Sequence, residues 1–393
     1  MKNLYKLLIS TLFIATFGFA TVTVDGYAYL ENETDHSGIT ITSERTHPSS
    51  LTETATTDAS GYFTTELETG VYDVTYTKDG YFFASLTNQT FYANTTLSDV
   101  TLLEHTTNIV VPYMFHTIQE ALNIATEGDT ISVYPGTYVE NIIWPETNGI
   151  KLIGSGEDDC FIDGDSLASV IRFEEDLGGI IDSSTLITGF TIQNGSGYIT
   201  LPGWNEFTLG SGGGVCILDS DPTLRNLIIE NNTAPGYAGG GIYSDGGDPI
   251  ISHCIVKNNS AVNHGGGIYI NESNYATLEH SEITGNAIFH PSTSYGGGIK
   301  INYSTITITN VTVSQNSALT GGGINLFRSD VNLINSNFLN NSPEEVSFHS
   351  TDTPNSIIID YSNIEGGLDS IVTNDNGTVT WGDGNIDVDP RFI

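Results

Sequence analysis

Short runs of alternating apolar and polar residues follow one another from residue 21 to residue 104. In one of them Tyr72, Val74 and Tyr76 alternate with more polar positions. Turn signals rich in Gly and Asp separate these runs, at residues 58–61, 68–70 and 78–80. Period-two strands with this punctuation are typical of a β-sandwich. We therefore predict an antiparallel β-sandwich over residues 21–104.

The pattern changes after residue 105. Apolar residues fall at positions 118, 121, 122, 124 and 125, which is an amphipathic helical spacing. Gly128-Asp129 follows the helical pattern, and residues 130–134 read as a strand. We predict a short helix at about 116–126.

A repeat occupies most of residues 105–393. Three consecutive Gly residues followed by Ile or Val begin at Gly212, Gly239, Gly265, Gly296 and Gly321. An Asn follows each triplet at a distance of 20 or 21 residues, and an apolar residue stands three positions before each Asn. Such constancy predicts one coil of a solenoid per repeat, with Asn side chains stacked between coils and tolerating left-handed backbone. The predicted structural ladder comprises Asn194, Asn232, Asn259, Asn286, Asn316 and Asn341.

Two segments resemble known families. Val24-Asp25-Gly26-Tyr27, Thr57–Phe63, Gly70–Val74 and Gly80-Tyr81 resemble the carboxypeptidase regulatory-like domain, a transthyretin-like sandwich, which implies a spacer or binding module without catalytic residues. Residues 116–122 and 135–141 resemble the entry segment of right-handed parallel β-helix proteins, the pectin-lyase-like fold. This resemblance implies that the helix at about 116–126 caps the first coil and covers its open sheet edge. The Gly triplets and Phe338-x-x-Asn341 are also similar to the repeats of polymorphic outer-membrane proteins. The expected fold class is all-β, a sandwich followed by a right-handed parallel β-helix.

Composition and the first twenty residues bear on location. Lys2 and Lys6 precede an apolar run at residues 7–19, so residues 1–20 read as a secretory signal peptide. No later segment is apolar for long enough to span a membrane, and we expect a secreted or cell-surface protein. The chain carries 47 acidic and 11 basic residues, a formal net charge of −36. This balance excludes a nucleic-acid binder and argues against binding to an anionic membrane.

Variation in repeat length falls between each Asn and the next triplet, and variable loops on one side of a solenoid are the usual binding face. Aromatic side chains in these loops would stack on sugar rings. The alternative is that they fold back and cover the sheet. The candidate ligand-binding residues are Tyr198, Trp204, Phe207, Tyr237, His264, Phe289, His290 and Tyr295.

Carboxylates form a second pattern six to nine residues after several triplets. Asp219, Asp221, Asp245 and Asp248 are candidate ligands for Ca²⁺, which prefers hard oxygen donors. The alternative is that they are solvated turn residues, with Asp221 and Asp248 simply preceding Pro at the start of a strand. No cofactor is required by the sequence, and Ca²⁺ is the one metal that it suggests.

The fold family implied by the resemblance includes lyases, hydrolases and epimerases that act on uronic-acid polymers. We call the carboxylates that follow the triplets the acidic stripe. Basic residues do not recur beside this stripe, except for Arg328 near Asp330. The polygalacturonase-like motifs, which are paired Asp, Gly-His-Gly and Arg-x-Lys, are not recognisable. We therefore expect a non-catalytic protein that presents one solenoid face for adhesion or carbohydrate binding. The strong negative charge favours a neutral glycan or a protein as the partner. The alternatives are a polysaccharide lyase or glycoside hydrolase, and a structural spacer of the cell envelope.

Overall fold

The computed structural model describes residues 20–174, 177, 179–197, 210–290, 294–350 and 353–389. Two compact units divide the chain, Met1–Thr106 and Thr107–Ile393. Nearly all of the regular structure is β-strand, as the sequence predicts. Among the described residues, no helix is long and apolar enough to cross a membrane.

The first unit is a sandwich of two four-stranded sheets. One sheet contains β4, β1 and β7, with β8 also paired to β1, and the other has the order β3-β2-β5-β6. The strands are β1 (Thr21–Leu30), β2 (Thr40–His47), β3 (Leu51–Thr56), β4 (Tyr62–Glu68), β5 (Gly70–Thr77), β6 (Ala84–Phe91), β7 (Thr95–Thr96) and β8 (Val100–Leu102).

Alternation along these strands builds the sandwich core. Every second residue of β5 is buried, including Tyr72, Val74 and Tyr76, and these side chains join one apolar cluster with residues from both sheets. One detail differs from the antiparallel arrangement that we predict. Strands β7 and β8 both run parallel to β1. Side-chain alternation identifies a strand but carries no information about the direction of its partner.

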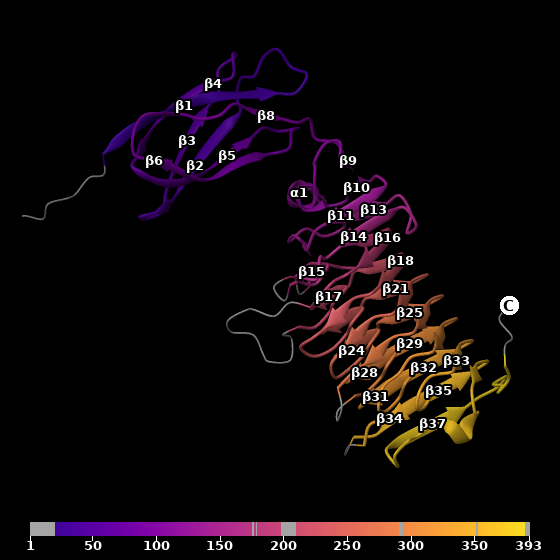
Figure 1. Ribbon diagram of the computed structural model, residues 1–393. Helices are drawn as coiled ribbons and strands as arrows, with labels where there is room; N and C mark the ends of the chain where they lie inside the picture. The colour runs from indigo at the N-terminus through magenta and orange to yellow at the C-terminus, as the bar shows by residue number, and fades with distance from the viewer. Residues whose placement is uncertain are drawn as a thin grey trace, which may run out of the picture. The chain divides into compact units, whose positions relative to one another are not determined.

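The second unit is a solenoid of parallel coils (Figure 1). We call its largest sheet the long sheet, and each repeat coil contributes to it either two consecutive strands or, in the coil that begins at Gly212, one longer strand. Its strands are β9 (Asn108–Val111), β10 (Thr130–Val133), β11 (Gly136–Val139), β13 (Lys151–Gly154), β14 (Cys160–Asp163), β16 (Leu186–Gln193), β18 (Thr223–Glu230), β21 (Ile250–Ser252), β22 (Ile255–Lys257), β25 (Thr277–Glu279), β26 (Glu282–Thr284), β29 (Thr305–Thr309), β30 (Thr312–Ser314), β32 (Asp330–Ile334), β33 (Asn337–Leu339), β35 (Asn355–Asp360), β36 (Asn363–Ile364) and β37 (Gly377–Trp381).

The sheet that follows the Gly triplets is called the triplet sheet. Its strands, in order, are β12 (Ile142–Ile143), β15 (Ile171–Phe173), β17 (Val215–Leu218), β20 (Ile242–Asp245), β24 (Ile268–Asn271), β28 (Ile299–Asn302), β31 (Ile324–Phe327) and β34 (Val346–Phe348). A third, short sheet contains β19 (Thr233–Ala234), β23 (Ser260–Ala261) and β27 (Ala287–Ile288), and a 3₁₀ turn spans Leu368–Ser370.

The predicted helix is present as α1 (Ile118–Ile124). Thr117 is its N-cap and forms a capping box with Glu120. Glu140 adds a second restraint, because its carboxylate accepts hydrogen bonds from the backbone N–H groups of Ile118 and Gln119, both at 2.9 Å. Ile118, Ala121 and Leu122 are buried, and α1 packs against β9, β10 and β12. The helix thus covers the first coil.

A continuous Asn ladder links the repeat coils. The Oδ1 atom of each Asn accepts hydrogen bonds from both the backbone N–H and the side-chain amide of the preceding Asn, from Asn232 to Asn341. Asn194 lies outside this ladder. Gly195 holds the equivalent position, and its N–H donates to Asn232 Oδ1 at 2.7 Å. The left-handed backbone also belongs to the preceding residues, such as Asn231 and Asn258, rather than to the ladder itself.

The Gly triplets serve a steric purpose at another corner. The first Gly of each triplet has a positive φ, between 57° and 72°. The second packs against the carbonyl groups of the next coil: a Cβ on Gly240 would lie 2.3 Å from the Gly266 oxygen and 2.4 Å from the Ser260 oxygen. Backbone therefore fills the space that a side chain would need.

Candidate functional site

The outer face of the triplet sheet carries a column of polar and aromatic side chains. Paired positions on consecutive strands place Cys216, Tyr243, Tyr269, Lys300 and Asn325 in register. Their neighbours on each strand, such as Ile268 and Ile270 in β24, are buried in the apolar interior. Because side chains alternate along a strand, this middle column points to the opposite face of the sheet.

Rings from the loops before each triplet cover this column. Tyr237, His264 and Tyr295 follow one another in successive coils, with ring centroids 5.0 Å apart for Tyr237–His264 and 5.6 Å apart for His264–Tyr295. His349 continues the row, 4.7 Å from Tyr295. Tyr237 and His264 also contact the Tyr269 ring of the sheet. Three of the predicted ligand-binding side chains are thus brought together, but they fold back onto the sheet and are half-buried.

The remaining predicted ligand-binding residues divide into two groups. Phe289 is 58% exposed and makes no ring contact with the described residues, while His290 is half-buried. Tyr198, Trp204 and Phe207 lie outside the described residues. Between Tyr237 and Tyr295 the aromatic rings do not form the free, exposed ridge that we predict. They form a packed, half-buried row instead.

Lys300 is the central basic residue of this face, and sequence reasoning missed it as a site residue. Only 2% of its surface is exposed. Its Nζ donates to Asn325 Oδ1 at 2.6 Å and lies 5.4 Å from the Phe327 ring centroid and 5.8 Å from that of Tyr295. Burial lowers the pKa of Lys300 well below its usual value. A signal was available, since Lys300 alone places a charge at the second position after a triplet.

Arg328 extends the basic character to the edge of the sheet. Its guanidinium lies over the rings of Tyr303 and Phe327, 5.4 Å and 5.3 Å from their centroids, and its Nη1 is 3.4 Å from the Tyr303 hydroxyl. Tyr303 is 46% exposed. The row of rings therefore ends on an accessible Tyr–Arg pair.

The acidic stripe is used for bonding between coils. Asp248 accepts hydrogen bonds from Ser273 Oγ and from the backbone N–H groups of Asn274 and Tyr275, at 2.6–2.9 Å. Asp221 accepts from the backbone N–H of Asp248 at 2.7 Å.

Asp245 accepts from Asn271 Nδ2 and from the Tyr243 hydroxyl. Burial and the neighbouring Asp245 raise the pKa of Asp219. In the described part of the chain, no group of three or more His, Cys, Asp or Glu side chains is placed to hold a metal ion.

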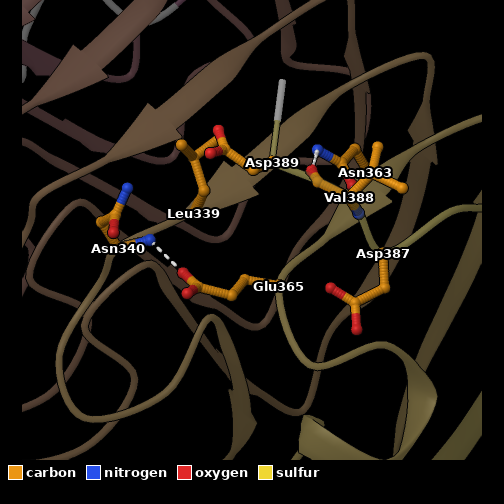
Figure 2. Close-up of a pocket in the computed structure, with 7 residues that line it drawn as sticks. All are labelled: Leu339, Asn340, Asn363, Glu365, Asp387, Val388 and Asp389. Atoms are coloured by element: carbon orange, nitrogen blue, oxygen red, sulfur yellow. Dashed lines mark hydrogen bonds between the residues drawn. The ribbon is translucent and has the colours of Figure 1, made fainter. Parts of the chain in front are cut away.

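A hollow lies beside the last coils, between residues 339–340, 363–365 and 387–389 (Figure 2). Its cavity volume is about 300 Å³, and it is lined by Leu339, Asn340, Asn363, Glu365, Asp387, Val388 and Asp389. Two of its carboxylates already accept backbone hydrogen bonds: Glu365 from Asn340 at 2.5 Å, and Asp387 from Gly366 at 3.1 Å. The hollow is acidic and has no aromatic ring on which a sugar could stack.

One comparison with known proteins, a family model, identifies the fold of the second unit. A family model described as "Right handed beta helix region" matches residues 130–296. No curated protein matches the chain. Among solved structures, pectin methylesterase PemA from Erwinia chrysanthemi is 12% identical, with 69% of this chain and 80% of that chain covered and a TM-score of 0.31.

Two further structures resemble the chain at a similar level. The catalytic unit of an α-1,3-glucanase of family GH87 from Streptomyces thermodiastaticus is 14% identical, covers 94% of this chain and 87% of its own, and has a TM-score of 0.25.

A cohesin–X-dockerin complex from Acetivibrio cellulolyticus is 25% identical over 21% of this chain, which spans 58% of that chain, with a TM-score of 0.18. TM-scores this low carry no argument about activity. The family match and the parallel coils together establish a right-handed β-helix as the fold of the second unit.

Proposed function

We propose that this protein is exported through residues 1–20 and binds glycans, without catalysis, on the outer face of its triplet sheet. The sandwich at residues 21–104 would be a carboxypeptidase regulatory-like module that holds the β-helix of residues 105–393 at a secreted or cell-surface location. The ligand-binding role rests on one observation, the row of rings that runs from Tyr237 through His264 and Tyr295 to His349.

The spacing of this row suits a saccharide chain. Successive ring centroids are 4.7–5.6 Å apart, close to the rise of one coil and about the length of one sugar residue. Polar groups lie between the rings, and the Oδ1 atom of Asn302 is buried without a hydrogen-bond partner. Apolar ring edges combined with a few unsatisfied polar atoms are the usual make-up of a ligand site. Asn302 Oδ1 is therefore an acceptor for a sugar hydroxyl.

A glycan array tests this proposal with the full chain. Wild type should bind at least one class of glycan, and Tyr303→Ala should weaken that binding about tenfold, because it removes an exposed ring that stacks on sugar. Tyr361→Ala is the matched control, since Tyr361 is 62% exposed at a corner of the long sheet. Equal losses in both variants, or no binding by wild type, would overturn the proposal. Complete absence of binding would favour the structural-spacer role.

A polysaccharide lyase is the second candidate, and Lys300 is the observation that favours it. Burial holds the Lys300 amine towards its uncharged form, which is the form able to accept a proton from substrate. Incubation with a panel of uronic-acid polymers would reveal a lyase through the ultraviolet absorbance of its unsaturated product. Activity that is present in wild type and lost in Lys300→Met would replace the non-catalytic proposal.

A further inference from the structure

One end of the triplet face is basic in a protein that is otherwise strongly acidic. Arg45, Arg172 and Lys257 each pair with a carboxylate, at 2.8, 2.5 and 3.0 Å. Within the described residues, neither Lys300 nor Arg328 has such a partner. The chain as a whole has more than four acidic residues for each basic one. These two basic side chains without a carboxylate partner, one buried and one half-exposed, therefore require an explanation.

Unsatisfied hydrogen-bonding atoms gather at the same end. The Nδ1 atom of His264 and the Nε atom of Arg328 are buried without a partner. The Lys300 amine has two N–H donors when it is neutral and three when it is protonated, and one of them is used, towards Asn325. A polar atom that is buried without a partner destabilises the protein, because it has lost its hydrogen bonds to water. A ligand that accepts hydrogen bonds would remove this cost, whereas a further apolar group would not.

Three basic side chains, Lys300, His349 and His264, lie close together at this end of the face. The His349 ring lies 4.7 Å from the Tyr295 ring and 5.1 Å from the Phe327 ring, the same two rings that flank the Lys300 amine. His264 stacks on the other side of Tyr295. Burial, followed by the charge of Lys300, lowers the pKa of His349 and lowers that of His264 to about 3. The free site therefore disfavours protons on all three groups.

Acidic groups on the neighbouring elements are engaged elsewhere. Asp245 on β20 accepts from Asn271 and Tyr243, and Glu344, in the loop before β34, accepts from the backbone N–H of Gly321 at 2.8 Å. Glu345 accepts from Asn341. Among the titratable groups of the described residues, Lys300 is the in-register neighbour of Tyr269 and lies near Tyr295, His264 and His349. Arg328 lies over the same Phe327 ring as the Lys300 amine. Within the part of the chain that the structure describes, no carboxylate forms a salt bridge with this cluster.

We propose that this basic end binds an oxyanion, the carboxylate or sulfate group of an acidic glycan, and takes up a proton from solvent with it. The inference rests on the proposed function and names the glycan class. The proton binds to the Lys300–His349–His264 group, and the anion balances its positive charge. The anion also accepts hydrogen bonds from donors that lack a partner. Because anion and proton enter together, the net charge of the site does not change. Entry displaces at least one of the half-buried rings of Tyr295, Phe327 and His349, because they enclose the amine. The negative net charge of the chain favours a neutral partner, but at this end of the triplet face the basic side chains favour an anionic one.

The glycan array tests this inference when it carries neutral, uronic-acid and sulfated members of the same backbones. At about pH 5.5, wild type should bind the acidic members at least about tenfold more tightly than the neutral ones, and the preference should shrink at about pH 7.5. Uronic and sulfated arms distinguish the two sources of the oxyanion. Lys300→Met should abolish the preference for the acidic members. Lys257→Met, which removes a paired lysine on the long sheet, should keep this preference.

Failure of the inference is distinguishable from failure of the proposed function. Neutral glycans bound as tightly as acidic ones by wild type would overturn the oxyanion site and leave glycan binding intact, whereas no binding at all would overturn both. If Lys300→Met does not fold, Arg328→Gln, at a half-exposed position, repeats the test. An unchanged preference for acidic over neutral glycans in the Arg328→Gln variant counts against the oxyanion site.

Calorimetric titration of wild type with the best acidic glycan, in two buffers of different ionisation enthalpy, should show net proton uptake. Zero uptake would refute the proton coupling.

Discussion

At the residue scale, the Asn ladder shows how far a sequence rule reaches. An apolar residue stands three positions before each ladder Asn, as Ile229 does before Asn232. Applied strictly, the rule selects Gly195, three positions after Ile192, and rejects Asn194, and this is what the hydrogen bond from Gly195 to Asn232 shows. Asn194 has a φ of 56° and donates to Asp163 instead. The prediction based on the Asn side chain at position 194 was wrong, whereas the spacing from the apolar residue identifies the correct position, Gly195.

The last rung of the ladder was not predictable from spacing. The donors of Asn341 are accepted by the Glu345 carboxylate, four residues later, with 3.0 Å from the backbone N–H to Oε1. A side chain from the same turn thus closes the ladder where no further Asn follows. Burial is the largest cause that raises the pKa of Glu345 to about 7, while the bonds from Asn341 act in the opposite direction.

This raised pKa makes stability depend on pH. Since the ordinary Glu pKa is about 4.3, the folded protein binds the Glu345 proton more tightly than the unfolded chain does. The contribution is therefore complete below about pH 4 and is lost as pH rises towards 7.

Asn341 donates to both oxygens of the Glu345 carboxylate. Glu345→Gln removes the charge and keeps one amide oxygen, and each ladder Asn shows that a single amide oxygen accepts from both donors of the preceding Asn. We expect the variant to be more stable than wild type by about 1–3 kcal/mol at about pH 8, with the advantage vanishing near pH 4. Chemical denaturation across pH measures this. Glu282→Gln, at an exposed position, is the control, and parallel pH profiles for wild type and Glu345→Gln would contradict the assignment.

At the scale of the element, the coil was predictable because one short motif fixes it. Each Gly triplet marks the start of a triplet-sheet strand and each Asn the turn after the long sheet, so a constant spacing defines the coil. Helix α1 was also predictable, although it is shorter than 116–126 because Thr117 caps it and Ile124 is its last residue. Pairing in the sandwich was less accessible, since strand direction is decided by packing partners far apart in sequence.

Two Gly substitutions separate steric need from backbone conformation. Gly240→Ala places a Cβ against backbone oxygens of two segments that are both fixed by hydrogen bonds, and we expect a loss of about 3 kcal/mol or more.

Gly285→Asn is the matched case. Its φ of 65° is similar to those of Asn258 (55°) and Gln315 (57°) in the same column, and the nearest atom to a new Cβ is the movable Oδ1 of Asn258. We expect a change within about 1 kcal/mol, because Asn tolerates left-handed backbone. Thermal unfolding of both variants measures the difference, and equal losses would show that the triplet is not sterically determined.

At the scale of the whole molecule, net charge was informative and also misleading. A formal charge of −36 correctly describes the average surface, but the triplet face departs from it through Lys300, Arg328, His264 and His349. These residues come from different coils and from the loop after β34, so no local sequence window contains them. Their proximity follows from stacking alone. The half-burial of the predicted aromatic residues has the same origin, because a loop ring packs on the sheet of its neighbouring coil.

Hydrogen–deuterium exchange of the full chain, with and without the tightest-binding glycan of the array, tests the central claim most directly. The account predicts that glycan slows exchange in residues 237–245, 264–271, 295–303 and 324–328, which form the triplet face and its covering loops, and leaves β25, β29 and β32 of the long sheet unchanged. Protection confined to the long sheet or to the sandwich, with the triplet face unaltered, would contradict it.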